Sequence, residues 1–322
     1  MNNILVTGGA GFIGSHLVTR FVSEGDKVCV LDNLSSGSEE NLPMGRIEFV
    51  KGDIRDDDLL DALVRKTDIV FHLAEFIPET EKFGPGHVIR YSVENPLLDF
   101  DVSCRGTLLL LDKCRQYDKR LVFTSTSAVY GAHNLVPIKE EFETLPVSPY
   151  GASKLCAETY LKLYSRLYGV PTTVVRLFNV FGPRQRKYVV YDTLLKLVVN
   201  QRKLEVLGTG EETRDFINVM DVVDALLLVA NARTTYGGVF NVGTGRGTRI
   251  KDVIKLITSI LGIDPEVKYA SESWRGDIKT LIADTSRIRG LGFAPKCSME
   301  DGLKEVIRWF HTEAGFRRLT HI

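Results

Sequence analysis

Short runs of apolar and β-branched residues alternate with helix-like segments through the first half of this chain. Five such runs fall before residue 125 and a sixth follows; they cover residues 4–7, 28–31, 47–50, 69–73, 121–124 and 173–178. Runs of this length and composition are typical of buried strands. Strands that are separated by helices pair in parallel through right-handed crossovers. The alternation therefore predicts an α/β fold, with a doubly wound parallel sheet covered by helices on both faces.

The second half of the chain is mixed. It contains a helix-like segment over 220–232, a strand-like run over 239–242 and a last helix-like segment over 301–311. The sequence has neither an internal repeat nor a low-complexity linker, which favours two closely packed domains. We expect the larger domain to comprise residues 1–180 together with 216–244, and the smaller, mixed one to be built mainly from 181–322.

Composition and charge exclude several classes of protein. Of the 322 residues, 44% are hydrophobic and 25% are charged, which is typical of a folded globular protein. Lysine and arginine number 41, as do aspartate and glutamate, so no excess of positive charge is available to bind nucleic acid or an anionic membrane. No apolar stretch approaches the roughly 20 residues of a spanning helix, and residues 1–7 do not resemble a signal peptide. The five scattered cysteines lack the paired spacing of a metal site, so we expect buried free thiols in a cytoplasmic protein.

A glycine-rich turn, GGAGFIG, follows the first predicted strand and precedes an apolar helix. Gly8 permits a tight turn, Gly11 lets a pyrophosphate approach the backbone, and Gly14 lets the helix pack closely against the strand. The N–H groups of the helix start, at Phe12 and Ile13, offer donors and partial positive charge to a phosphate. The turn therefore predicts a Rossmann-type dinucleotide site, although a glycine triplet alone also fits a turn without a ligand.

Polar residues at the ends of the next two strands extend this site. Asp32 follows the glycines by about 20 residues, where a carboxylate accepts hydrogen bonds from the adenosine ribose and repels a 2′-phosphate. NAD is therefore favoured over NADP, with the adjacent Asn33 in the same site. Asp53 and Ile54 end the third strand and are suitably placed for the adenine. Asp53 alternatively caps the helix that follows.

A second candidate constellation lies at a predicted helix start. Ser148 is a natural N-cap, Pro149 suits the first helical position and Gly169 suits the end. Within such a helix, Tyr150 and Lys154 lie one turn apart on the same face. A neighbouring ammonium and a cationic nicotinamide favour the phenolate, so Tyr150 is predicted to act as the acid/base. Taken alone, the pair also fits a surface tyrosine and a solvated lysine on an amphipathic helix.

The strand predicted over 121–124 runs into the hydroxyl residues of TSTS, where ligands of a parallel sheet bind. Together with TGGAGFIG, the strand-end Asp32, YGASK, RLFNVFGPRQ and RDFINVMDVVDA, this strand resembles the extended short-chain dehydrogenase/reductase family across nearly the whole chain. Within it the sequence is most similar to the nucleotide-sugar 4-epimerases typified by UDP-glucose 4-epimerase. The resemblance implies a catalytic triad of Thr126, Tyr150 and Lys154, with Thr126 also contacting the substrate and Tyr150 and Lys154 also contacting NAD. It further implies a homodimer through helices near 97–117 and 150–168.

The resemblance also implies a nucleotide-sugar site in the second domain. Asn179 and Arg214 match family positions that contact the diphosphate, although Arg214 could instead pair with a nearby aspartate and Asn179 could cap a turn. Late in the chain, Trp274 stands where the family usually has an arginine. Arg275 is expected to substitute for it from the next position, with Asp277 as a ribose or structural partner.

The residues after Thr126 separate the family's reactions. Related 4,6-dehydratases typically carry Asp-Glu there, and UDP-glucuronate decarboxylases a glutamate at the second place, whereas this chain has Ser127 and Ala128. Epimerisation needs no further acid or base. We therefore expect NAD-dependent 4-epimerisation of a nucleotide hexose of the UDP-glucose/UDP-galactose type. The alternatives are a dehydratase, a decarboxylase and a non-catalytic NAD-binding protein.

Three features depart from the family pattern. About ten extra residues lie within 76–91, and their Gly-Pro composition suggests a lid that selects the hexose or, alternatively, an inert insertion. Glu75 stands where a small residue is usual, and we assign it no catalytic role. Ser103 replaces a common asparagine. His72 is expected to be a hydrogen-bonded strand-end residue rather than a metal ligand.

Overall fold

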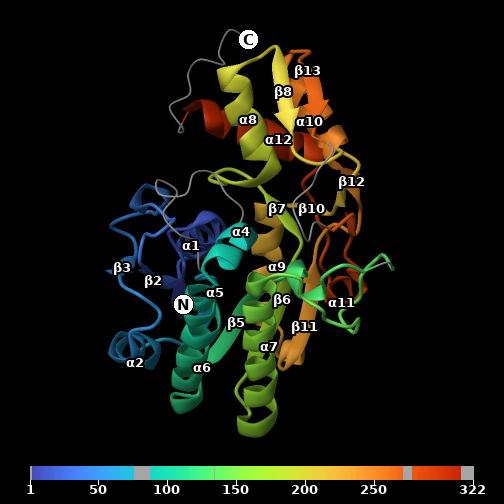
Figure 1. Cartoon of the computed structure of the whole chain (residues 1–322). Helices are drawn as coiled ribbons and strands as arrows, with labels where there is room; N and C mark the ends of the chain where they lie inside the picture. The colour runs from blue at the N-terminus through green and yellow to red at the C-terminus, as the bar shows by residue number, and fades with distance from the viewer. Residues whose placement is uncertain (1, 76–87, 134, 271–277, 313–322) are drawn as a thin grey trace.

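The computed structural model describes residues 2–75, 88–133, 135–270 and 278–312. Its centre is a seven-stranded sheet in which every neighbouring pair of strands is parallel, in the order β11-β6-β5-β4-β1-β2-β3 (Figure 1). The strands are β1 (Asn3–Thr7), β2 (Lys27–Asp32), β3 (Glu48–Lys51), β4 (Ile69–His72), β5 (Arg120–Thr126), β6 (Thr172–Leu177) and β11 (Gly238–Val242). The predicted doubly wound parallel sheet is confirmed.

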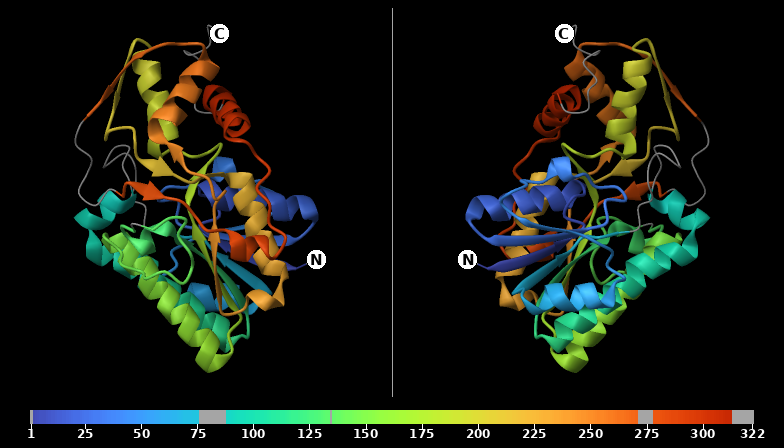
Figure 2. Two further views of the ribbon diagram at one scale, coloured as in Figure 1. Left: turned by 90° about the vertical axis from the view of Figure 1, so that its right-hand side faces the viewer. Right: turned by 90° about the vertical axis from the view of Figure 1, so that its left-hand side faces the viewer.

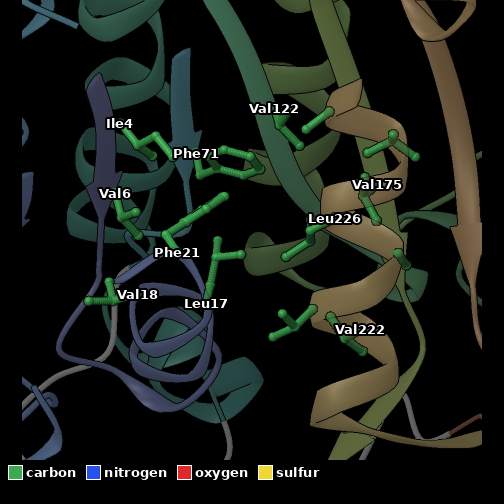
Figure 3. Packing of buried hydrophobic residues seen from close by; sticks show 14 of the residues in the cluster. Ile4, Val6, Leu17, Val18, Phe21, Phe71, Val122, Val175, Val222 and Leu226 are labelled. Carbon is green, nitrogen blue, oxygen red and sulfur yellow. The ribbon is translucent and has the colours of Figure 1, made fainter. Parts of the chain in front are cut away.

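Helices cover both faces of this sheet because successive strand residues point to opposite sides. On one face, Ile4 and Val6 of β1 pack with α1 (Phe12–Glu24) and α9 (Val219–Asn231), as Figure 3 shows. Leu5, between them, belongs to the core on the other face. That face is covered by α2 (Asp57–Arg65), α6 (Thr107–Gln116) and α7 (Pro149–Tyr168).

Two long helices lie side by side at the outside of the second face (Figures 1 and 2). The first runs through α5 (Pro96–Phe100), the π-helical segment η2 (Asp101–Gly106) and α6. The second, α7, begins where predicted: the hydroxyl of Ser148 accepts a hydrogen bond from the N–H of Gly151 at 3.2 Å, and Pro149 is the first helical residue. Gly169 ends the helix with φ 71°, a conformation that favours glycine.

A separate group of elements packs around its own core at the other end of the molecule (Figure 2). It comprises α8 (Tyr188–Val199), β8 (Lys203–Val206), α10 (Ile250–Leu261), β13 (Glu266–Tyr269) and α12 (Met299–Thr312). The remaining short elements are η1 (Glu39–Asn41), α4 (Val88–Glu94), η3 (Ser127–Tyr130), β7 (Asn179–Phe181), β9 (Thr213–Arg214), β10 (Phe216–Asn218), η4 (Arg233–Thr235), β12 (Thr248–Arg249), β14 (Thr280–Leu281) and α11 (Ser286–Arg289).

All five cysteines are free thiols, as predicted. Cys104 and Cys114 are buried, but the expectation of burial is wrong for Cys29, Cys156 and Cys297, which are partly exposed. In the part of the chain that the structure describes, no helix is both long and apolar enough to cross a bilayer.

Candidate active site

A cavity of about 880 Å³ opens at the carboxyl ends of the central strands. The strand order reverses between β1 and β4, which is where ligands bind in sheets of this kind. Every predicted site residue that the structure describes lines this cavity: Gly8, Gly11, Phe12, Ile13, Gly14, Asp32, Asn33, Asp53, Ile54, Thr126, Tyr150, Lys154, Asn179 and Arg214. Arg275, Asp277 and Trp274 lie outside the described residues, as do residues 76–87 of the predicted lid. Residues 88–91 belong to α4.

The glycine turn leaves no room for side chains. Gly8 has φ 70°, and a Cβ there would lie 2.7 Å from the backbone nitrogen of Ala74 after β4. A Cβ on Gly14 would overlap the carbonyl oxygen of Gly8. Gly11 is the N-cap residue of α1 and has no side chain to occupy the N–H groups of the first turn. This bare turn at a helix N-terminus fits the pyrophosphate of a dinucleotide.

Asp32 is held beside that turn. Its two carboxylate oxygens accept hydrogen bonds from the N–H groups of Ala10 at 2.9 Å and Leu34 at 2.8 Å. Burial raises the pKa of Asp32 and these two bonds oppose the rise. The bonds fix the carboxylate at the end of β2, where it lines the cavity.

The carboxylate of Asp53 pairs with neighbouring side chains and does not cap the helix that follows. Its carboxylate accepts two bonds of 2.8 Å from the guanidinium of Arg55, and one of 3.3 Å from the amide of Asn33. The hydrogen bonds from Arg55 lower the pKa of Asp53. Helix α2 is capped instead by Asp56, so the alternative that Asp53 caps this helix is wrong.

Tyr150, Lys154 and Thr126 come together at the wall of the cavity. The ammonium of Lys154 donates to the carbonyl oxygen of Thr124 at 3.1 Å and lies 4.7 Å from the ring centroid of Phe123. Thr126 neighbours the hydroxyl of Tyr150, and its Oγ1 accepts a hydrogen bond from the N–H of Ala128 at 3.1 Å. Lys154 is only 3% exposed, so the alternative of a solvated lysine on a surface helix is wrong.

The electrostatics around Tyr150 differ from the expectation. Burial, the charge of Glu75 and the neighbouring Tyr188 raise the pKa of Tyr150 well above its usual value, and the hydrogen bond with Thr126 lowers it. Lys154, which was expected to lower this pKa, is not among the groups that shift it, and its ammonium forms a buried ion pair with Glu75. Sequence reasoning left Glu75 without a role. The available signal was that Glu75 and Ser103 both depart from the family pattern; the structure adds that they contact each other.

A second unassigned residue lies on the α8 side of the cavity. The Nζ of Lys187 is buried with no hydrogen-bond partner among the described residues, 5.9 Å from the ring centroid of Tyr91. Burial lowers the pKa of Lys187 to about 8. Lysine side chains usually lie in solvent, so nothing in the sequence singled out Lys187.

Asn179 and Arg214 lie on adjoining short strands. The N–H of Asn179 donates to the carbonyl oxygen of Asp215 at 3.0 Å, so Asn179 begins β7 and does not cap a turn. The guanidinium of Arg214 donates to the carbonyl oxygen of Thr213 at 3.0 Å. Asp215 is buried and accepts from the N–H groups of Thr244 and Gly245 at 2.7 and 2.9 Å.

His72 ends β4 with hydrogen bonds on both sides of its ring. Nδ1 lies 2.6 Å from the hydroxyl of Thr7 and Nε2 lies 2.9 Å from that of Thr107. Burial lowers the pKa of His72 to about 3. The prediction of a hydrogen-bonded strand-end residue is confirmed.

Comparison with known proteins agrees with this geometry. Residues 4–243 match the sequence profile of the NAD dependent epimerase/dehydratase family. A putative UDP-glucose 4-epimerase of Methanocaldococcus jannaschii is 36% identical over 95% of this chain and 97% of its own length. The UDP-glucose 4-epimerase of Thermotoga maritima, solved with UDP-glucose, superposes with a TM-score of 0.88 at 36% identity, over 97% of this chain and 99% of the other.

A third relative binds a different sugar. The UDP-N-acetylglucosamine 4-epimerase of Methanobrevibacter ruminantium, solved in complex with UDP-N-acetylmuramic acid, has a TM-score of 0.88 at 35% identity, with the same coverage. These matches span the glycine turn, the Tyr150 helix and the smaller core alike. The chain therefore belongs to the NAD dependent epimerase/dehydratase family, with the extended short-chain dehydrogenase/reductase fold and NAD as its cofactor.

Proposed function

We propose that this protein interconverts the C4 epimers of a nucleotide-activated hexose, of the UDP-glucose/UDP-galactose type or their N-acetyl or uronic-acid counterparts. The observation that carries the proposal is the meeting of Thr126, Tyr150 and Lys154 in one cavity with the glycine turn. Ser127 and Ala128, which follow Thr126, have no ionisable group. Epimerisation requires one proton acceptor and one hydride acceptor, and this site has a place for each.

The residues divide the work of binding NAD. The turn at Gly8, Gly11 and Gly14, with the N–H groups of Phe12 and Ile13, would hold the pyrophosphate. Asp32 would accept the adenosine ribose hydroxyls. Asn33, Asp53 and Ile54 would surround the adenine, and Lys154 would hold the nicotinamide ribose. NAD, when bound, supplies a hydride acceptor for C4 that gives the same hydride back.

Tyr150 performs the proton transfer in this proposal. Its phenolate oxygen accepts the proton of the C4 hydroxyl as the C4 hydride leaves, which produces a 4-keto sugar. The hydroxyl of Thr126 holds the reacting oxygen. After the keto sugar has presented its other face, Tyr150 returns the proton to the oxygen and the hydride re-enters C4. The cycle consumes no redox equivalents, so the cofactor is expected to stay bound.

Three cationic or polar side chains support binding of the diphosphate. Asn179 and Arg214 line the cavity beside the second core. Lys187 adds a buried ammonium without a hydrogen-bond partner in the described part of the chain, and a phosphate oxygen would satisfy it. Arg275 and Asp277 remain predictions for the same subsite.

The competing reactions need groups that this site does not place beside Thr126. A 4,6-dehydratase needs an additional acid and base to remove water, and Ser127 and Ala128 supply neither. Glu75 is a carboxylate in the cavity, but it is paired with Lys154. A non-catalytic NAD-binding protein has no need of an acid/base such as Tyr150 with Thr126 beside it in the cavity.

Product analysis separates these proposals. Purified protein is incubated with UDP-glucose, UDP-galactose, their N-acetyl forms and UDP-glucuronate, without added cofactor, and the products are identified by nuclear magnetic resonance. We expect a 4-epimer from at least one substrate. Loss of water or of carbon dioxide would instead identify a dehydratase or a decarboxylase. No product from the whole panel would leave a binding protein.

The same proposal assigns NAD and the nucleotide sugar to different domains and includes a homodimer. Residues 1–180 with 216–244 would bind NAD and 181–322 would mainly bind the nucleotide sugar, which the separate core around α8, α10 and α12 supports. The outer helices expose apolar side chains, among them Leu97 at 85% and Leu167 at 61%, which supports a partner chain on this face. A cytoplasmic location remains a prediction, supported by the free thiols.

A further inference from the structure

Two departures from the family pattern, 28 positions apart in the chain, meet beside Lys154. Glu75 follows β4 by three residues, and Ser103 lies in the π-helical segment η2. The hydroxyl of Ser103 donates to one carboxylate oxygen of Glu75, and the other oxygen forms the ion pair with the ammonium of Lys154. The carboxylate thus bridges the helix to the lysine.

We propose that Glu75 is a positioning residue for the reaction, whose carboxylate, held by Ser103, fixes Lys154 beside Tyr150 and balances the charge of the lysine. This inference rests on the proposed function and adds a residue to it. The pH range over which the protein turns over substrate then depends on the charge of Glu75.

Burial makes this ion pair effective. The side chains of Lys154 and Glu75 are 4% and 9% exposed, so water screens their charges only weakly. The lysine is held from three directions: by Glu75, by the carbonyl oxygen of Thr124 and by the ring of Phe123. Removing one member of such a pair leaves a buried charge without its partner.

Ser103 is itself fixed in place. Thr107 donates to the carbonyl oxygen of Ser103 at 2.6 Å, and the same hydroxyl of Thr107 contacts His72 at 2.9 Å. Single π turns inside α-helices occur often at functional sites. Here the π-helical segment carries the hydroxyl that orients Glu75.

Other titratable groups face this centre from the neighbouring helices. Asp99 of α5 accepts a 2.6 Å hydrogen bond from Ser153. Burial and the charge of Glu75 raise the pKa of Asp99 to about 6, against the lowering by the Ser153 hydrogen bond and the charge of Lys154. Tyr188 of α8 is a neutral phenol, because burial raises its pKa to about 12. His72 below is neutral as well. Asp99 therefore also carries negative charge towards this site near neutral pH, but among the described residues Glu75 is the carboxylate that is paired directly with Lys154.

The consequence for Tyr150 has a definite sign. A negative charge beside a phenol disfavours its phenolate, and an uncompensated ammonium favours it. Replacing Glu75 with a neutral residue removes the negative charge and leaves the ammonium of Lys154 uncompensated. Both changes lower the pKa of Tyr150, so Tyr150 acts as a base at lower pH than in the wild-type protein.

The test is the pH profile of kcat/KM for Glu75→Gln, measured with whichever UDP-hexose the wild-type protein turns over. We expect the acid limb to move down by about one pH unit. We also expect kcat at the plateau to fall, because Lys154 is less firmly placed. An acid limb at its wild-type position would overturn the inference. Absence of turnover in the wild type would instead sink the proposed function, so the two failures are distinct.

Three further variants make the result specific to the charge and its position. Glu48→Gln is the matched control, since Glu48 forms an exposed pair with Lys66 at 3.2 Å, and its acid limb should not move. Glu75→Asp keeps the charge and should restore most of the wild-type acid limb; a shift as large as that of the glutamine variant would refute the role of charge. Ser103→Ala should shift the limb in the same direction by less, and it serves where Glu75→Gln does not fold.

Discussion

Tyr150 carries the proposed proton transfer through a single oxygen, which makes its removal informative. Phenylalanine retains the ring and its packing against the start of α7 but can neither accept nor donate the proton. We expect Tyr150→Phe to lose about 10²- to 10⁴-fold in kcat, the usual contribution of a positioned acid or base. Bound NAD, released by denaturation and quantified, should be retained. Near-normal turnover would remove Tyr150 from the mechanism.

Asp32 is the residue that we expect to set the preference of the site for NAD over NADP. Asp32→Asn keeps an acceptor for one of the two N–H groups of Ala10 and Leu34, but it removes the charge that repels a 2′-phosphate. We expect the affinity for NAD to fall roughly tenfold, because a charge-assisted hydrogen bond is lost. We also expect the ratio of the affinities for NAD and NADP to become smaller. Calorimetry on protein stripped of its cofactor measures both affinities.

The matched control for this variant is Asp26→Asn, since Asp26 accepts from the N–H of Asn2 at the opposite end of α1. Its affinities for both cofactors should be unchanged. An Asp32→Asn protein that still rejects NADP as strongly as the wild type would show that another group excludes the 2′-phosphate.

At this scale the sequence could predict which candidate residues lie together where their spacing is local. Gly8 and Gly14 lie within one turn, and Tyr150 and Lys154 lie within one helix, so spacing alone brings each pair together. Glu75 could not be assigned in this way, because its partners lie on other elements and its contact with Ser103 depends on how η2 packs against β4. The raised pKa of Tyr150 follows first from burial and then from the charge of Glu75, and the sequence reveals neither.

At the scale of elements, helix α7 is attached to the sheet by a buried ion pair. The guanidinium of Arg176 on β6 donates to Glu158 of α7 at 2.6 Å, with both side chains almost fully buried. Ser125 donates to the same carboxylate at 2.5 Å. Because α7 also carries Tyr150 and Lys154, this pair holds the catalytic helix in register with the cavity.

Breaking that pair should be costly. Glu158→Gln leaves Arg176 buried without its counter-charge, and we expect the free energy of unfolding to fall by about 3 kcal/mol. Glu300→Gln is the control, because Glu300 pairs with Lys304 at 2.6 Å on the surface of α12, and a loss of less than about 1 kcal/mol is expected there. Urea denaturation of the two variants measures both effects. Equal losses would mean that the buried pair contributes no more than a surface one.

Several long elements were predicted, but helices α8 and α10, each of 12 residues, were not, and neither were the short strands of the second half. Helix α7 has its cap, its first-turn proline and its terminal glycine in the sequence, and the six strands predicted before residue 180 have the composition of buried strands. Strands β7, β9 and β14 have two or three residues each, which is too few to show the alternation of apolar and polar residues that identifies a strand. The π-helical segment η2 differs from the helices around it only in its hydrogen bonding, which the sequence does not reveal.

At the scale of the whole molecule, two elements from the second half of the chain pack with the domain that the first half builds. Strand β11 forms the edge of the seven-stranded sheet beside β6, and α9 packs against α1 on the same face. The cavity is consequently lined by residues from both halves, from Gly8 to Leu281. Such a site exists only in the folded chain, which is why its nucleotide and sugar preferences could not be inferred from motifs.

The exposed face of the two outer helices is the remaining feature of the molecule that calls for a partner. Leu163 and Leu167 lie one turn apart on α7 and are 42% and 61% exposed, and Leu97 on α5 is 85% exposed. Apolar side chains gathered on adjacent helices are typical of helix-to-helix subunit contacts, and a closed dimer buries the same face on both chains. Gel filtration with light scattering should therefore give twice the mass of one chain.

A charge on this face should separate the subunits, because it would be buried without a counter-ion. We expect the double variant Leu163→Arg/Leu167→Arg to elute at the mass of one chain while keeping its bound NAD. Val199→Arg is the matched control: Val199 is 87% exposed at the end of α8, far from these helices, and that variant should remain dimeric (Figure 1). A wild-type protein with the mass of one chain would refute the dimer. A double variant that stays dimeric would place the contact on another face.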